Sequence, residues 1–253
     1  TWNNREWTLE RSILRPFLHD VQLHAYTRPR PNKYIIFPYR LGGRRAELIQ
    51  PAELQATCPG AWAYLSARRG DLENRNITGG TAAERQFYQY GRTQSLMKFN
   101  TAKIILPVLS LEPRYAYDDQ NIVVTGGGNG PFYLVRPKKT STCSLYYLLA
   151  VLCHPLSEAL VRSRTSVFGG GYYSHGKQFI QELPIPESAP EVRQAIDDLV
   201  ERTIRATAAA EGARTPAVRA EKEREAEALR LRIEQAITEA FGLLEVELAA
   251  VRA

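Results

Sequence analysis

The sequence predicts an α+β fold, with a mixed, β-rich region over residues 1–186 and a helical hairpin or short bundle over residues 187–253. Three observations predict this division. Runs of aromatic and β-branched residues alternate with glycine and proline in the first region, which is typical of strands and turns. Apolar residues recur at helical spacing over residues 144–164. The same helical spacing returns after residue 187 and continues to the end of the chain.

The first region contains four segments with strand character. Residues 33–39 and residues 103–109 are rich in isoleucine, leucine and aromatic residues. Pro107 favours an edge position or a bulge for the second of these strands, because proline cannot donate a ladder hydrogen bond. Residues 122–125 and 132–135 predict the two strands of a hairpin, joined by the glycine-rich loop 126–130.

Two short helices are expected in the first half of the chain. One begins at Pro51 and the next near Pro59, because proline is favoured in the first turn of a helix. The second helix is expected to carry Trp62, Leu65 and Leu72 on one face.

A longer helical segment follows over residues 144–164. Ser144 is the expected N-cap, and Pro155 is expected to kink or split the helix.

The helical region after residue 187 is expected to fold as a hairpin with a terminal helix. Gly212 and Pro216 mark the break between its two long helices, and Gly242 is the expected C-cap of the second. The apolar stripes of these helices either pack on their own domain or dock to another domain or subunit.

Charge is distributed unevenly. The net charge is +6, and residues 1–186 contain more basic than acidic side chains whereas residues 187–253 contain more acidic ones. A basic body with an acidic tail suggests a polyanionic partner for the body. A mildly basic surface is also common among proteins that bind no polyanion.

Cysteine usage and hydropathy give further expectations. The three cysteines, Cys58, Cys143 and Cys153, are odd in number and form no CxxC motif, so we expect neither a disulfide framework nor a zinc site. This cysteine usage is typical of a protein in a reducing cytoplasm, which is the compartment we expect. No apolar run reaches the roughly 18 residues of a membrane-spanning helix. The N-terminal residues lack the apolar stretch of a signal peptide. Residue 1 is not Met, so we expect a segment before it.

The motifs of common catalytic sites are missing. The sequence holds no GxxxxGK[ST] loop, and the glycines of 126–130 precede a strand pattern rather than a helix. The four histidines show no metal-ligand spacing, and neither Asp/Glu-x-Lys nor Asn-Pro-Pro-Tyr occurs. The chain by itself is therefore predicted not to be an enzyme.

Basic and aromatic residues gather in three segments, namely 85–98, 137–140 and 162–178. Arginine, lysine and glutamine side chains can bind phosphates or the edges of guanine and adenine. Any one of these segments is equally compatible with a solvated surface. Three such segments in one region that carries an excess of positive charge favour a nucleic-acid partner.

Several motifs, in order, resemble one known family. They include residues 34–39, Tyr90-Gly91-Arg92-Thr93-Gln94, residues 103–107, residues 170–179 and residues 183–186. These segments resemble the TaqI-like specificity domain of type II restriction–modification methylases, and the resemblance covers nearly the whole chain. Leu244 and the Gly130-Pro131 pair depart from the family pattern.

The resemblance implies an adenine-N6 methyltransferase, often fused to an endonuclease, in which this region binds duplex DNA and selects the site. It implies a catalytic domain that precedes the region in the same chain and binds S-adenosylmethionine, with no cofactor in this region. The DNA sequence that the chain recognises cannot be inferred from the resemblance, because recognition domains diverge at the positions that contact bases.

Eight residues are the expected DNA contacts: Arg92, Gln94, Lys98, Lys138, Arg162, Arg164, Tyr172 and Lys177. Arg92 and Lys177 rank first, because each lies in a matching motif. Their alternative role is to pair with local carboxylates and hold the shape of the motif. Other interpretations of the chain are a separate specificity subunit, a fragment of a phage-defence methylase, or a helical protein–protein interaction scaffold.

Overall fold

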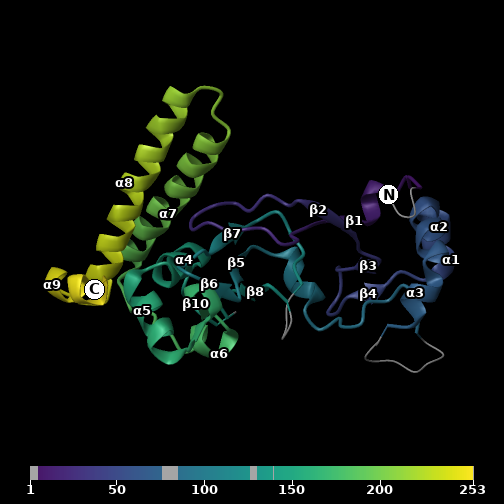
Figure 1. The fold of residues 1–253 in the computed structure, drawn as a ribbon, viewed down its shortest axis with the longest axis horizontal. Coiled ribbons are helices and arrows are strands. Elements are labelled where there is room, and N and C mark those ends of the chain that lie inside the picture. Colours follow the sequence, from purple (N-terminus) through teal and green to yellow (C-terminus); the bar gives the residue numbers. More distant parts are fainter. Residues whose placement is uncertain (1–4, 76–84, 126–129, 139, 253) are drawn as a thin grey trace. The chain divides into compact units, whose positions relative to one another are not determined.

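The computed structural model describes residues 5–75, 85–125, 130–138 and 140–252 (Figure 1). Helices and small antiparallel sheets make up these residues, which confirms the predicted α+β class. Contacts within the chain define two compact units. Unit 1 comprises Thr1–His19, Pro31–Thr101 and Gln120–Val123, and unit 2 comprises Asp20–Arg30, Ala102–Asp119 and Val124–Ala253.

Unit 1 combines two small antiparallel sheets of two strands each with three α-helices among its described residues. Its elements are η1 (Arg11–Ile13), β1 (Leu14–Phe17), β2 (Lys33–Ile36), β3 (Tyr39–Arg40), β4 (Glu47–Leu48), α1 (Pro51–Thr57), α2 (Pro59–Ala67), α3 (Arg69–Glu73) and η2 (Leu96–Asn100). β1 pairs with β2, and β3 pairs with β4. The predicted strand 33–39 is therefore broken, since Phe37 leaves the strand and its backbone N–H donates to Ile13 at 2.7 Å.

Helices α1 and α2 of unit 1 begin at the predicted prolines. Trp62, Leu65 and Leu72 pack against one buried cluster, as expected, although α2 ends at Ala67 and Leu72 belongs to α3. The N-terminus of α2 is held by Glu10, whose carboxylate accepts hydrogen bonds from the backbone of Gly60 at 2.8 Å and Ala61 at 3.0 Å.

Gly60 is required for this close approach. A Cβ at this position would lie 2.3 Å from the carbonyl oxygen of Thr8, so any larger residue would push the two segments apart.

Unit 2 contains two three-stranded sheets and six α-helices among its described residues. Its elements are β5 (Lys103–Pro107), β6 (Leu109–Ser110), β7 (Ala116–Asp118), β8 (Phe132–Val135), α4 (Leu145–Leu152), α5 (Pro155–Arg164), β9 (Val167–Phe168), η3 (Gly169–Gly171), β10 (Tyr172–Ser174), α6 (Lys177–Ile180), α7 (Pro190–Glu211), α8 (Pro216–Ala240) and α9 (Glu245–Arg252). The sheet orders are β7-β5-β8 and β6-β10-β9, and all pairings are antiparallel.

β5 is the central strand of its sheet, which corrects the expectation of an edge strand. β7 pairs with residues 103–105 of β5, whereas β8 pairs with residues 104–107. Pro107 therefore lies beyond the end of β7, where a missing N–H costs no ladder hydrogen bond. At the other end of β5, Lys103 forms a fully buried ion pair with its cross-strand neighbour Asp118. This lysine belongs to the motif 103–107 and serves the fold.

The predicted hairpin between residues 122 and 135 is wrong. β8 pairs with β5, and Val123 forms a single parallel bridge with Phe17 inside unit 1. Residues 126–129 of the predicted loop lie outside the described part of the chain. Sequence pattern alone favoured a partner close in the chain, and the observed pairing is with a more distant strand.

Helix boundaries in unit 2 follow the predicted caps. Ser144 caps α4 by accepting a hydrogen bond from the N–H of Tyr147 at 2.9 Å, and its hydroxyl donates to Asp197 of α7 at 2.5 Å. The predicted split at Pro155 is confirmed, because α4 ends at Leu152 and α5 begins at Pro155. His154 caps α5 through Nδ1, which accepts from the N–H of Leu156 at 3.2 Å.

The helical region forms the predicted hairpin of α7 and α8, followed by α9 (Figure 1). Gly242 ends α8 with a positive φ of 71°, as expected. Ile196, Val200, Ile233 and Ile237 share one buried cluster with α4, so these stripes pack on their own unit. The contacts therefore place the helical region in unit 2 together with β5–β8. A functional division after Pro186 stays a prediction.

Two further expectations concern the described residues. Cys58, Cys143 and Cys153 are free thiols, and no cluster of potential metal ligands occurs in the part of the chain that the structure describes. None of the described helices combines the length and apolar character needed to cross a membrane.

Candidate nucleic-acid interface

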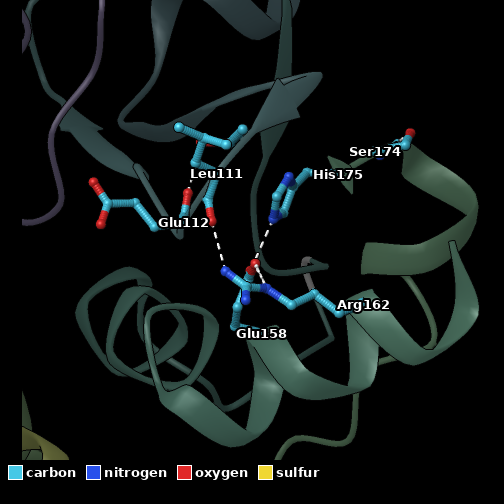
Figure 2. A network of polar contacts seen from close by, with 8 residues as sticks. Leu111, Glu112, Glu158, Arg162, Ser174 and His175 are labelled. Carbon is cyan, nitrogen blue, oxygen red and sulfur yellow. Dashed lines mark hydrogen bonds and ion pairs between the residues drawn. The ribbon is translucent and has the colours of Figure 1, made fainter. Parts of the chain in front are cut away.

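A buried polar network ties α5 to β10 and to the chain around β6 (Figure 2). The carboxylate of Glu158 accepts a hydrogen bond from Nε2 of His175 at 2.8 Å and from Nε of Arg162 at 2.7 Å. A second guanidinium nitrogen of Arg162 donates to the carbonyl oxygen of Leu111 at 2.6 Å. The backbone N–H of His175 donates to the carbonyl oxygen of Val108 at 2.7 Å. Side chain and backbone together fix the end of β10.

The charge state of Glu158 follows from its partners. Burial raises the pKa of its carboxyl, but the hydrogen bonds from His175 and Arg162 outweigh burial and hold the pKa below its ordinary value. Glu158 is therefore ionised at neutral pH and can only accept hydrogen bonds. Nε2 of His175 carries the hydrogen in this pair, and its buried Nδ1 has no hydrogen-bond partner within the described residues.

The sheet β6-β10-β9 presents an apolar face to solvent. Tyr172 pairs with Phe168, and Ser174 pairs with Leu109. Because side chains alternate along a strand, Leu109, Phe168 and Tyr172 share one face with Ser174. They are 45%, 48% and 38% exposed. We call these three residues the apolar hairpin face.

The opposite face of this sheet carries Ser110, Tyr173 and, at the edge, Val167, which is 60% exposed. Ser110 is buried, and Tyr173 lies beneath the guanidinium of Arg162, 4.8 Å from the ring centroid. Arg162 therefore holds three groups of unit 2 together, and its side chain is 43% exposed. It has a structural role, whether or not it also contacts a ligand.

Three more predicted residues lie close to this sheet in the chain. Arg164 ends α5, and its nearest carboxylate oxygen, on Glu182, is 3.8 Å away. Tyr172 begins β10, and Lys177 begins α6. Lys177 is exposed and pairs with no carboxylate among the described residues. Arg162, Arg164, Tyr172 and Lys177 thus all lie on neighbouring elements of unit 2.

A second group of predicted residues lies in unit 1, on the segment that leads into η2. Arg75 anchors the start of this segment by donating to the carbonyl oxygens of Phe87 at 3.0 Å and Gln89 at 2.9 Å. Tyr90 donates its hydroxyl to the carbonyl oxygen of Ile36 at 2.5 Å, and its N–H donates to the hydroxyl of Tyr39 at 2.7 Å. Burial raises the pKa of Tyr39 to about 12, so its hydroxyl stays neutral at physiological pH.

Beyond this anchor the side chains are free. Arg92, Gln94 and Lys98 are exposed, and their side chains form no hydrogen bond or ion pair with other described residues. The alternative role in which Arg92 and Lys177 pair with local carboxylates is therefore not observed. Lys138 is also exposed, in the segment that follows β8 in unit 2. Residue 139 lies outside the described residues.

Sequence reasoning missed two features of this region. Phe168 and Leu109 were not singled out, although the glycines that follow Phe168 are a turn signal that could have identified a hairpin. Glu158 was missed because its partner His175 lies on another element, and no local pattern connects them.

A groove in unit 2 is a weaker candidate. It has a volume of about 480 Å³ and lies between residues 24–30 and the helices α7 and α8. Its lining mixes arginines with Glu211 and Glu223, and Arg30 already pairs with Glu211 at 2.9 Å. Mixed charge of this kind gives little attraction for a polyanion.

Comparisons with known proteins point to restriction–modification enzymes. No family model matches the chain. It is 25% identical over 189 residues to the type II restriction enzyme and methyltransferase RM.Eco57I of Escherichia coli, which covers 72% of this chain and 19% of that protein. It is 24% identical over 146 residues to the type II methyltransferase M.BanIII of Aneurinibacillus aneurinilyticus, which covers 56% of this chain and 24% of that protein.

A solved structure shares the fold. The type IIL restriction–modification enzyme MmeI, solved in complex with DNA, matches 95% of this chain and 30% of its own chain, with a TM-score of 0.53 and 12% identity. The chain therefore spans only about a fifth to a third of the proteins it matches. Its sequence similarity is to type II restriction–modification methyltransferases, as the motifs indicated.

Proposed function

We propose that this chain is the target-recognition module of a restriction–modification protein and that it binds duplex DNA. One observation carries the proposal: the chain matches a fraction of each of three restriction–modification proteins and most of its own length in MmeI, which was solved with DNA. The methylation of adenine N6, the binding of S-adenosylmethionine and any cleavage belong, in this proposal, to other parts of the same protein.

The described surface supports a two-layered mechanism of binding. Arg92, Lys98, Lys138, Arg164 and Lys177 are exposed cations. They would neutralise phosphates and give an affinity that depends on salt but not on sequence. A few side chains, such as Gln94 and Tyr172, would read base edges, each good contact contributing about 1–3 kcal/mol of discrimination.

A base-modifying partner domain imposes a further demand. An adenine must leave the base stack before its N6 can be methylated, at a cost of a few kcal/mol. In the proposal, this chain holds the duplex while the catalytic domain receives the flipped base. Arg162 has a positioning role, because its guanidinium connects Glu158, Leu111 and Tyr173.

The test is to bind the chain to a pool of randomised duplexes at low and at physiological salt and to sequence the retained DNA. The expected result is salt-dependent binding with an enriched short sequence. Binding without enrichment would leave a DNA clamp and remove the recognition role from the isolated chain. If no duplex is retained at low salt, the DNA-binding proposal for this chain is wrong.

A further inference from the structure

The apolar hairpin face is unusual for an outer surface of a small antiparallel sheet. Such sheets normally pack one face on the core and present polar side chains to water on the other. Here one face carries Leu109, Phe168 and Tyr172 together with Ser174, and the other carries Ser110, Tyr173 and Val167, of which Val167 is 60% exposed. The edge strand β9 therefore exposes an apolar side chain on each face of the sheet. Exposed apolar side chains that gather on one small sheet are a candidate site of interaction.

The hairpin of β9 and β10 has a narrow end. Gly169–Gly171 connects the two strands, and Gly170 and Gly171 have positive φ angles of 80° and 81°. The turn carries no side chain, so its backbone can approach another molecule closely. β6 pairs only with Tyr173 and Ser174, so at Phe168 and Tyr172 the hairpin extends beyond this pairing as two strands. Two strands have the width that the major groove of duplex DNA admits.

The base of the hairpin is held rigidly. His175 follows β10 directly and is fully buried against Glu158, and Arg162 bridges from α5 to Leu111 next to β6 (Figure 2). A hairpin fixed in this way loses little conformational entropy when it inserts, which favours a specific contact.

Charge around the hairpin favours DNA over an apolar protein partner. Arg162 and Arg164 precede β9 in the chain, and Lys177 follows β10. Glu158 is neutralised by two partners inside unit 2. Arg164 and Lys177 therefore lie near the base of the hairpin, where exposed cations can bind backbone phosphates.

We propose that the β9–β10 hairpin enters the major groove and that Phe168 packs against the 5-methyl group of a thymine in the recognised sequence. This inference rests on the proposed function and adds an element and a base contact to it. Phenylalanine is a side chain suited to this contact, because the thymine methyl is the apolar feature of the major groove. Tyr172 is the direct cross-strand neighbour of Phe168 and lies on the same face.

The test uses the full 253-residue chain and the duplex enriched from the randomised pool. Each thymine of that duplex is replaced in turn by deoxyuridine, which removes only the methyl group. We expect one thymine at which this replacement weakens binding about tenfold, or about 1.4 kcal/mol. Phe168→Ala is expected to weaken binding to the thymine duplex by a similar factor and to abolish the sensitivity to deoxyuridine at that position.

Leu231→Ala is the matched control, because Leu231 is an apolar residue on α8 that is 57% exposed, against 48% for Phe168. It should retain both the affinity and the deoxyuridine sensitivity, and circular dichroism checks that both variants fold. If Phe168→Ala binds the same enriched sequence with the same deoxyuridine sensitivity, the hairpin inference is wrong while DNA recognition stands. Absence of binding or of any enriched sequence would overturn the inference together with the recognition role.

Discussion

At the scale of single residues, the chain separates side chains that hold the fold from side chains that remain available. Lys103 lies in a motif of the family that the sequence resembles, yet it is buried against Asp118. Arg75 is likewise held inside the fold, because its guanidinium donates to two backbone carbonyls. Arg92 and Lys177 are exposed without a carboxylate partner among the described residues. A basic residue in a matching motif is therefore not by itself a DNA contact.

Glu158 allows a prediction on stability. Glu158→Gln replaces an ionised acceptor of two hydrogen bonds, so we expect the free energy of unfolding at pH 7 to fall by about 2 kcal/mol. Chemical denaturation monitored by circular dichroism measures this. Glu182→Gln is the control, because Glu182 is exposed and its ion pair with Arg164 is long. Its effect should stay within about 0.5 kcal/mol.

The pH dependence of the Glu158→Gln effect has a definite sign. The folded-state pKa of Glu158 lies below its ordinary value of 4.5. The stabilisation from its charge is therefore complete above the unfolded pKa and is lost as the pH falls through the lowered folded pKa. The difference in unfolding free energy between wild type and Glu158→Gln should shrink as the pH falls below about 4.5. A difference that stays constant to pH 3 would contradict this account.

At the scale of elements, the sequence predicted those features that local chemistry decides. Ser144 and Pro155 set the boundaries of α4 and α5, and Gly242 ends α8. The hairpin expected between residues 122 and 135 failed, because β8 pairs with β5 across intervening chain. Strand pairing is decided by tertiary packing, and a local pattern contains no information on which strand becomes the neighbour.

Only part of the candidate site could be predicted from the sequence, because the rest also depends on tertiary packing. The clusters of basic and aromatic residues are visible in the sequence, and the exposed cations belong to them. The apolar hairpin face required the register of β6, β10 and β9, since only the register shows that Leu109 and Phe168 share a face. The buried pair of Glu158 and His175 depends on contact between α5 and the end of β10.

The turn of the β9–β10 hairpin allows an element-level prediction. Gly171→Ala places a Cβ at a φ of 81°, where it would meet the Leu111 side chain at an ordinary contact distance of 3.8 Å but the backbone is strained. We expect a loss of about 1 kcal/mol in unfolding free energy. Gly169→Ala is the matched control, because a Cβ there meets nothing within 4 Å and no positive φ occurs. It should be neutral or slightly stabilising, and equal losses for both variants in thermal unfolding would argue against strain at Gly171.

At the scale of the whole molecule, the residues that we expect to contact DNA are divided between the two units. Arg92, Gln94 and Lys98 belong to unit 1, whereas Lys138, Arg162, Arg164, Tyr172 and Lys177 belong to unit 2. If both units contact DNA, cations of each should contribute to counterion release.

The salt dependence of binding tests this division. Arg92→Gln and Lys177→Gln are each expected to reduce the slope of log affinity against log salt by about 1. The measurement is a titration of labelled duplex at several salt concentrations. Lys222→Gln should leave the slope unchanged, because Lys222 lies on α8 and pairs with Glu225 at 2.8 Å. A change for Lys177→Gln without a change for Arg92→Gln would restrict the DNA contact to unit 2.

The interleaving of the two units limits how such a chain can change. Residues 20–30 and 102–119 belong to unit 2 but are flanked by segments of unit 1. A single recombination crossover between two related genes would therefore join parts of both units from different parents, so that strands such as β5 and β8 could come from sequences that never packed together. Single substitutions on exposed positions preserve every such pairing. New variants of this chain are thus expected to arise by point mutation of its surface more readily than by exchange of whole segments.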